Sequence, residues 1–354
     1  MKYSYNYIFL SNNKKQFYKY NHKDLNGDLV VRFYDGLMIK ANAFVKTLYR
    51  LHFSPRVNKF IKIPFKHIWN RWYFHEKMPN DKPICFVISC ELYFLKKYKY
   101  FEFLRKKYQN CKLVFLFTDM VDYVSLRFED FDIEYLRRVF DYVVTYEIYD
   151  VKKYKLTYFY NFLPPVFEKT FIDAEKTADV VFVGEAKDRL DTILDCYKFF
   201  ISNGVICDFS IAFAPKEIRK LYPDINWIDE WISFEEVLTK IKHSKCILDI
   251  VQNNSFGLNA RAIRAFQYNK FLISNCPSIR HCTLRDDFYV QYFDSISDIK
   301  VSHLKESPSP DYNFDSIQNA LSSFTFFENL FNNNDSVDSF YLPLIDIKEI
   351  IKEI

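Results

Sequence analysis

The sequence predicts an α/β protein with two parallel-sheet domains. Short apolar runs alternate with segments of helical periodicity along most of the chain, a pattern typical of strands joined by crossover helices. The alternation breaks at Leu163-Pro164-Pro165 and resumes at Asp179. The chain has 354 residues, of which 49% are hydrophobic, so it is long for one core and sufficient for two. We therefore expect a joint near the two prolines and a cleft between the strand ends.

In the first half, runs rich in aromatic and β-branched residues predict strands, and amphipathic segments between them predict helices. The expected strands are 5–10, 29–33, 84–89, 112–117 and 142–145, and the expected helices are 39–51, 93–108 and 133–139. Pro55 follows the first of these helices as a stop. Asp119 and the segment 146–150 come directly after strands, where parallel sheets bind their ligands.

In the second half, the same signals predict strands at 180–183, 207–213, 226–228, 246–251 and 271–274. Gly204 is placed to cap one helix at its C-terminus, and Ser233 with Glu236 forms a capping box at the start of another. Helical periodicity returns at 312–331 and 346–354. The expected domains are 1–164 and 165–310, followed by C-terminal helices 311–354 that pack back on the first domain.

The charge is unevenly distributed along the chain. Residues 1–110 contain 22 Lys and Arg against 7 Asp and Glu, whereas the remainder contains 27 against 38, from totals of 49 and 45. Within the basic part, the segment 52–82 interleaves Trp69 and Trp72 with Lys, Arg and His. Such a segment suits an anionic membrane surface, and it also suits single-stranded nucleic acid, although no RNA-binding signature accompanies it. A solvated basic face is the third interpretation.

Several classes of protein are excluded by missing motifs. The eight cysteines include no CxxC pair, so neither a zinc site nor a redox motif is indicated. The absence of GxGxxG, GxxxxGK[ST], GxSxG and HExxH argues against NAD, P-loop, serine-hydrolase and zinc-protease chemistry. The N-terminus lacks a signal-peptide pattern, and no apolar run approaches the ~20 residues that span a bilayer. We expect a reduced, cytoplasmic protein.

The stretch 246–266 is the most informative part of the chain. An apolar run predicts a buried strand, a polar loop and Gly257 follow, and apolar residues then recur at helical spacing from Leu258. A helix start there offers unpaired N–H groups and the positive end of the helix dipole to a phosphate, and Arg261 adds charge-assisted hydrogen bonds. An ordinary strand-to-helix junction without a ligand fits the same pattern.

A series of motifs carries a family resemblance over about residues 84–290. In the second half they are Asp179-Val-Val-Phe-Val-Gly-Glu-Ala-Lys-Asp-Arg-Leu190, Trp231-Ile-Ser-Phe-Glu-Glu-Val-Leu238, Ile247-Leu-Asp-Ile-Val-Gln252 and Ser255-Phe-Gly-Leu258. In the first half they are Lys112-Leu-Val-Phe-Leu-Phe-Thr-Asp119, Phe140-Asp-Tyr-Val-Val-Thr-Tyr146 and Tyr160-Asn-Phe-Leu-Pro164. In this order they resemble the motifs of GT-B-fold glycosyltransferases, in particular the small bacterial enzymes that build capsular, lipopolysaccharide and exopolysaccharide chains.

The resemblance implies a GT-B fold, with two Rossmann-like domains facing a central cleft, a nucleotide-sugar donor in the C-terminal domain and an acceptor in the N-terminal one. It also implies that no metal and no resident cofactor is required. Gly184 would let the backbone approach the diphosphate, and Lys187 or Arg189 would neutralise it. Asp119 would be the general base for an acceptor hydroxyl if the enzyme inverts. The remaining donor-binding residues that the resemblance implies are Glu230 near the base and Asp249, Ser255, Gly257, Leu258 and Arg261 around the helix start.

The chain departs from the family at one position. A glutamate in the helix after Gly-Leu usually holds the donor ribose, and Arg264 stands there instead. An arginine cannot accept hydrogen bonds from the ribose hydroxyls, so either another sugar nucleotide is used or the donor site is degenerate. Plainer roles also fit four candidates: Asp119 can cap a turn, Lys187 and Arg189 can sit in a solvated first turn, and Glu230 can be a surface residue.

The predicted activity is transfer of a sugar from a nucleotide-diphosphate sugar, UDP- or GDP-linked, to a hydroxyl of a lipid-linked or polysaccharide acceptor in bacterial surface glycan synthesis. The expected partners are the nucleotide-sugar, the lipid-linked glycan acceptor and the inner-leaflet membrane surface, with no nucleic acid. The segment 52–82 would dock a cytoplasmic enzyme peripherally on the inner membrane. The alternative is a catalytically degenerate binding or scaffold subunit of a glycan assembly complex.

Overall fold

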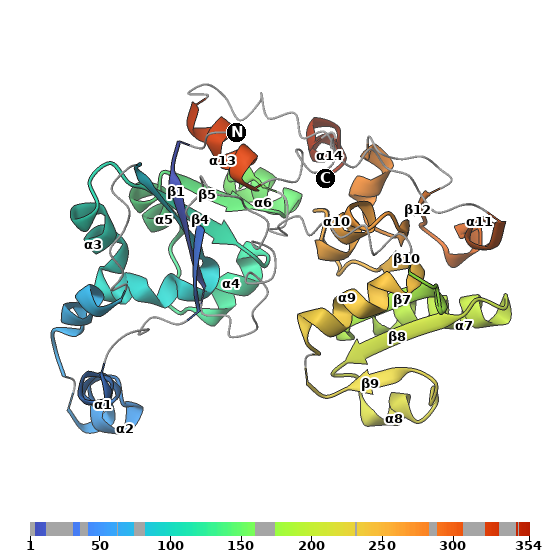
Figure 1. Cartoon of the computed structure of the whole chain (residues 1–354), viewed down its shortest axis with the longest axis horizontal. Helices are drawn as coiled ribbons and strands as arrows, with labels where there is room; N and C mark the ends of the chain where they lie inside the picture. Colours follow the sequence, from blue (N-terminus) through green and yellow to red (C-terminus); the bar gives the residue numbers. More distant parts are fainter. Residues whose placement is uncertain are drawn as a thin grey trace. The chain divides into compact units, whose positions relative to one another are not determined.

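The structure is a computed structural model. It describes residues 4–11, 31–35, 42–61, 63–73, 82–159, 174–230, 232–282, 289–306, 323–332, 345 and 347–354. Residue contacts divide the chain into two units, Met1–Val144 and Thr145–Ile354 (Figure 1). The sequence places the change of domain at 164–165, which lies outside the described residues.

The first sheet has six strands in the order β2-β1-β3-β4-β5-β6. Their bounds are β1 Asn6–Ser11, β2 Val31–Asp35, β3 Ile84–Ser89, β4 Lys112–Phe117, β5 Tyr142–Thr145 and β6 Thr157–Tyr158. β1 pairs in parallel with β2 and β3, and β3 pairs in parallel with β4. All residues of β1 and β3 are buried, which explains why both strands read as continuous apolar runs.

The helices of the first unit are short. They are α1 Ala43–His52, α2 Pro55–Phe60, η2 Lys66–Trp72, η3 Cys90–Tyr98, α3 Tyr100–Lys107, α4 Val121–Arg127 and α5 Ile133–Val139. The single helix expected over 93–108 is wrong, because Lys99 has a left-handed backbone with φ of 50° and separates the 3-10 helix η3 from α3.

The second sheet has the order β12-β11-β10-β7-β8-β9, and all its neighbouring strands pair in parallel. The bounds are β7 Ala178–Glu185, β8 Cys207–Ala212, β9 Asn226–Ile228, β10 Ser244–Asp249, β11 Phe271–Ser274 and β12 Val290–Tyr292. The chain moves outward from β7 on one side and outward from β10 on the other. The carboxyl ends of β7 and β10 therefore flank the point where an open parallel sheet binds its ligands.

Helices of the second unit pack on this sheet and on one another. They are α6 Ile148–Tyr154, η5 Lys187–Arg189, α7 Leu190–Ser202, α8 Lys216–Arg219, α9 Phe234–Lys242, α10 Ala260–Gln267, η6 Pro277–His281, η7 Ile296–Asp298, α11 Ser302–Glu306, α13 Ser323–Asn332 and α14 Ile347–Glu353. α9 packs against β7 and β10, α10 against β10 and β11, and α14 against α6 and η6 (Figure 1). Within the part of the chain that the structure describes, no helix is long and apolar enough to cross a membrane.

Lys270, between α10 and β11, makes the stability of the second unit depend on pH. Its side chain is buried and donates hydrogen bonds to the carbonyl oxygens of Lys242 and Ser244 at 3.1 and 2.6 Å. Burial, followed by the nearby charge of Lys176, lowers the pKa of Lys270 from 10.5 to about 6. The unfolded chain, with the ordinary pKa, binds more protons between these two values, so the free energy of unfolding should rise with pH across that window.

The expected slope is at most about 1.4 kcal/mol per pH unit, the value for one proton. Urea unfolding of the natural chain and of Lys270→Met between about pH 6 and pH 9 checks this. The stability of the natural chain relative to the variant should increase with pH. A difference that stays constant would show that Lys270 remains protonated when folded.

Candidate functional site

Four of the predicted residues converge at the carboxyl ends of β7 and β10. Gly184 lies near the end of β7, and Asp249 is the last residue of β10. Arg189 ends the turn η5 that follows β7, and Arg261 lies in the first turn of α10. The topology of the sheet therefore brings together residues from two segments that are far apart in the sequence.

Asp249 fixes the start of α10. Its side chain is fully buried, and Oδ1 accepts hydrogen bonds from Asn259 Nδ2 at 2.6 Å and from Arg261 Nε at 2.9 Å. Oδ2 accepts one from the hydroxyl of Ser274 at 2.9 Å. Asn259 is also the N-cap of α10 and accepts from the backbone N–H of Arg261 at 2.8 Å. One carboxylate thus orients both the helix cap and the guanidinium group.

Arg189 and Arg261 form a pair of neighbouring cations. Arg189 Nη1 and Arg261 Nη2 both donate to the carbonyl oxygen of Ile250, at 2.6 and 2.9 Å. Both guanidinium groups face the ring of Phe182, 5.9 and 5.4 Å from its centroid. Burial, and then the positive charge of Arg261, lowers the pKa of Arg189 to about 9. The electrostatics of this pair favour the binding of an anion.

Gly184 lets both arginines approach the strand. A Cβ atom on Gly184 would lie 3.2 Å from Arg189 Nη2 and 3.2 Å from Arg261 Nη1. Neither nitrogen donates a hydrogen bond to any described residue, since the bonds of these two side chains run through their other nitrogens. Two forked donors with uncommitted N–H groups beside a glycine backbone are suited to the oxygens of a phosphate.

The loop before α10 is paired with an acid that the sequence did not single out. Glu147, which follows β5 and is fully buried, accepts through Oε1 from the N–H groups of Phe256 and Gly257 at 2.7 and 3.0 Å. Its Oε2 accepts from the hydroxyl of Ser255 at 2.8 Å. Burial raises the pKa of Glu147 above its ordinary 4.5, although these hydrogen bonds act in the opposite direction.

The start of α10 differs from the expectation. The helix begins at Ala260 and not at Leu258, and Leu258 is buried in the core. Gly257 is needed for a close approach of two backbones, because a Cβ there would lie 2.0 Å from the carbonyl oxygen of Tyr146. The N–H groups of Phe256 and Gly257 are thus paired with Glu147.

The remaining predicted residues are exposed or are paired with other partners. Lys187 is exposed and forms an ion pair with Glu185 at 3.1 Å. Glu230 is exposed. Asp119 belongs to the first unit, where it accepts hydrogen bonds from Arg127 Nη2 at 2.5 Å and from the N–H of Met120 at 3.1 Å.

Arg264, at the position where the resemblance predicts a glutamate, is part of the packing between α9 and α10. Its guanidinium group lies over the ring of Phe234 at 5.0 Å, and burial lowers its pKa to about 10. This packing gives the departure from the family pattern a structural role in the helix interface.

Sequence reasoning missed Glu147 and the second role of Phe182. The sequence places the segment 146–150 at the end of a strand. Nothing in that segment indicates that Glu147 binds a loop more than a hundred residues away. Phe182 reads as a core residue of a strand, which it is. Its contact with two guanidinium groups depends on how the chain folds around it. Among the described residues, no group of three or more His, Cys, Asp or Glu is placed to hold a metal ion.

Comparison with protein-family models and with curated proteins gives no match. Among solved structures, the chain is similar to an "alpha-glucosyltransferase in complex with UDP and a 13-mer DNA containing a central A:G mismatch", with a TM-score of 0.50 and 13% identity over 98% of this chain and 99% of that one. It also matches Arabidopsis thaliana UGT89C1 complexed with quercetin, with a TM-score of 0.38 and 11% identity over 98% and 90%. The first of these shares the fold, and the predicted α/β class with two parallel sheets is confirmed.

Proposed function

We propose that this chain is a glycosyltransferase that moves a sugar from a nucleotide-diphosphate sugar to an acceptor hydroxyl. The observation that carries the proposal is the arginine pair, Arg189 and Arg261, held beside Gly184 at the point where the strand order of the second sheet reverses. Parallel sheets of this topology bind nucleotides at that point. The glucosyltransferase that shares the fold was solved with UDP, which supports UDP as the first nucleotide to test.

The chemistry of the transfer explains why two cations are needed. When the bond between the sugar and the diphosphate breaks, negative charge builds up on the leaving nucleoside diphosphate, and fixed positive groups stabilise that charge. Arg189, through Nη2, and Arg261, through Nη1, would supply these positive groups without a metal ion. Asp249 would keep Arg261 oriented before the substrate arrives, because its ion pair at 2.9 Å is fully formed in the protein alone.

The finer parts of the proposal concern the acceptor. Asp119, at the carboxyl end of β4, would be the base that removes the proton from the acceptor hydroxyl. The acceptor would be a lipid-linked or polysaccharide glycan in bacterial surface glycan synthesis. The enzyme would meet it at the inner leaflet of the membrane, which is consistent with the basic first third of the chain.

Thermal unfolding in the presence of UDP, GDP, dTDP, CDP or CMP, with and without magnesium, tests the donor site. A nucleotide that binds only the folded protein, at a hundred times its dissociation constant, adds about 2.7 kcal/mol of stability. We expect one nucleotide to raise the midpoint without magnesium. Gly184→Ala should abolish this shift, since the new methyl group displaces both donor nitrogens while leaving the charges in place.

Arg261→Lys is the second variant, because a lysine keeps a positive charge near the buried carboxylate of Asp249 and loses the forked donor. Arg280→Lys is its matched control, since Arg280 is paired with Asp294 on the surface. A nucleotide shift that survives both Gly184→Ala and Arg261→Lys would place the donor elsewhere. No shift with any nucleotide would favour the alternative function, a catalytically degenerate binding or scaffold subunit. The supporting observation is that the loop 255–257, expected to bind a phosphate, is hydrogen-bonded to Glu147 instead.

A further inference from the structure

Exposed apolar side chains are concentrated in one part of the first unit. Of thirteen large hydrophobic side chains exposed among the described residues, seven fall between residues 44 and 68. They are Phe44, Leu48, Leu51, Phe60, Ile61, Phe65 and Ile68. We call these seven residues, with the lysines and arginines among them, the basic apolar surface. Phe44 and Phe60 are 71% and 84% exposed, values that are unusual for residues of this type.

The helix α1 presents part of this surface as a continuous stripe. Phe44, Leu48 and Leu51 are spaced by four and three residues and therefore share one helix face, and α1 has no buried residue. A different face anchors it: Tyr49 packs edge-on against Trp69 at 5.4 Å, and Trp69 Nε1 donates to His52 Nδ1 at 2.8 Å. The stripe is thus held outward by fixed contacts.

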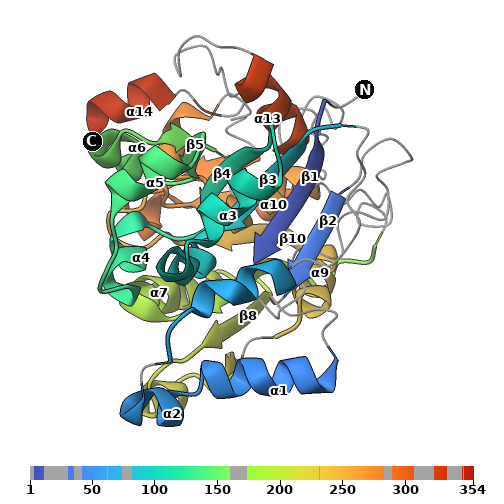
Figure 2. The same cartoon turned by 90° about the vertical axis from the view of Figure 1, so that its left-hand side faces the viewer.

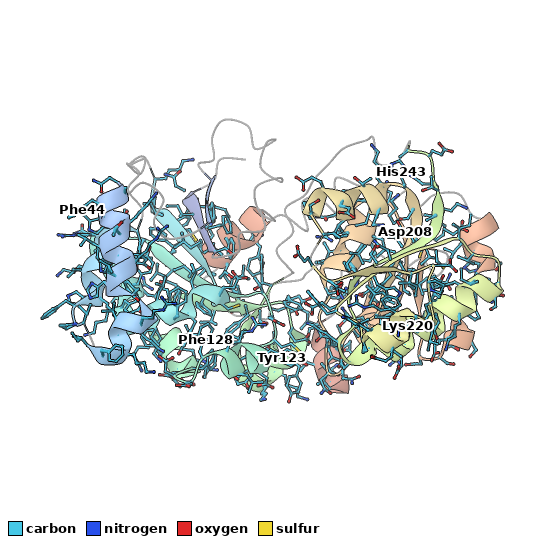
Figure 3. All side chains as sticks on the ribbon, turned by 90° about the horizontal axis from the view of Figure 1, so that it is seen from below. Phe44, Tyr123, Phe128, Asp208, Lys220 and His243 are labelled. Carbon is cyan, nitrogen blue, oxygen red and sulfur yellow. The ribbon has the colours of Figure 1, made fainter. Side chains whose placement is uncertain are left out.

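Two views show the position of this surface. α1 and α2 lie beyond the ends of the strands β1 and β2 of their own unit (Figures 1 and 2). Phe44 lies on the outer side of α1 (Figure 3). An outward apolar stripe at the edge of a unit is accessible to a large, flat partner.

The charge of this segment has one sign only. Residues 42–73 contain seven cations and no Asp or Glu, and the cations are Lys46, Arg50, Arg56, Lys59, Lys62, Lys66 and Arg71. None of the six that the structure describes forms an ion pair with a described carboxylate. Uncompensated cations beside exposed apolar residues complement a surface that is anionic and has an apolar interior.

We propose that the basic apolar surface docks the protein on a bilayer that contains anionic lipid. Phe44, Leu48 and Leu51 enter the boundary between headgroups and acyl chains, and Arg50, Arg56 and Lys59 contact the lipid phosphates. Nucleic acid would satisfy the cations and stack on phenylalanine, but it offers nothing to exposed leucine and isoleucine side chains. The proposal deepens the proposed function by naming the surface, and it includes α1, most of which lies outside the segment 52–82 that the sequence indicates.

Flotation of the full chain with vesicles tests the docking without any donor or acceptor, so its outcome is independent of glycosyl transfer. The vesicles are phosphatidylcholine alone, or an equal mixture with phosphatidylglycerol. We expect binding to the mixed vesicles only, weakened by salt. The charge variant Arg50→Gln, Arg56→Gln, Lys59→Gln should bind on the order of a hundredfold more weakly, from the usual contribution of each cation.

The apolar variant Phe44→Ser, Leu48→Ser, Leu51→Ser should lose at least about tenfold in vesicle affinity, through the area it can no longer bury. Its matched control is Leu126→Ser, Ile206→Ser, Leu221→Ser, which removes three apolar side chains elsewhere that are on average more exposed, and it should bind as the natural chain does. Equal binding by the apolar variant and the natural chain would overturn the proposal. Absence of binding to the mixed vesicles would also overturn the proposal. If the natural chain then binds a mixed-sequence DNA oligonucleotide and the charge variant binds it more weakly, the surface is assigned to nucleic acid.

Discussion

Gly257→Ala should destabilise the second unit by at least about 3 kcal/mol, the upper end of what an added methyl group costs in a packed site. The new Cβ would lie 2.0 Å from the carbonyl oxygen of Tyr146 and 3.1 Å from Cα of Glu147. Both atoms belong to backbone, so no side-chain rotation can relieve the clash. The loop would have to move away from Glu147 and break the hydrogen bonds that Phe256 and Gly257 donate to it.

Gly184→Ala is the matched comparison for this variant. A Cβ on Gly184 meets only side-chain atoms, at 3.1 to 3.2 Å, and two of the three belong to flexible arginines. We expect it to cost less than about 1 kcal/mol. Urea unfolding of both variants at one pH measures the two free energies. A loss for Gly257→Ala as small as the one expected for Gly184→Ala would mean that the loop 255–257 can shift without cost and that Glu147 does not hold it.

Glu147→Ala should cost about 3–5 kcal/mol, as expected when one partner of a buried charged network is removed. It leaves the hydroxyl of Ser255 and the N–H groups of Phe256 and Gly257 without their acceptor in a buried place. Glu147→Gln should recover most of this loss. Its amide oxygen can accept the two N–H groups at the position of Oε1, and its amide nitrogen can donate to Ser255 Oγ.

The pH dependence of Glu147→Gln distinguishes a buried carboxyl group from a simple packing role. The pKa of Glu147 is raised in the folded protein, so the folded state retains its proton in a range where the unfolded state has lost it. The stability of the natural chain relative to Glu147→Gln should therefore fall as pH rises from 4.5 to the raised pKa, and stay level above it. Urea unfolding at several pH values measures this, and a difference that increases with pH would contradict it.

The sheets were predictable because strands of a parallel sheet that are buried on both faces appear in the sequence as short apolar runs. β3 and β4 are apolar over most of their length, β10 has the apolar centre Cys246-Ile-Leu248, and each was expected within two residues of its observed start. β6 and β12 were missed, since they have two and three residues and are too short to show a pattern. α6 was missed because its seven residues are interrupted by Asp150, a buried acid that helical periodicity does not anticipate.

The site was predictable to the extent that it depends on residue type near a strand end. The family resemblance indicates Gly184 and Arg189, and the strand-loop-helix pattern indicates Arg261; the structure places all three near the carboxyl ends of β7 and β10. Glu147 was not found, because its partners are contributed by a segment that only the folded chain brings to it. The expected helix start at Leu258 was wrong for a related reason: Asn259, a strong N-cap residue, takes that role and moves the helix to Ala260.

The hydrogen bond from Gly257 to Glu147 also bears on the order in which the second unit folds. It spans 110 positions of the chain and encloses β7, β8, β9 and β10, each of which can pair with a neighbour close in sequence. Because contacts between distant parts of a chain form slowly, the local βαβ units should form before the hydrogen bonds between Glu147 and the loop 255–257. A fragment beginning at Glu175 would retain all the strands of the second sheet but would lack Glu147, which accepts the hydrogen bonds of the loop 255–257. The segment 145–159, supplied as a separate peptide, would be the piece such a fragment needs.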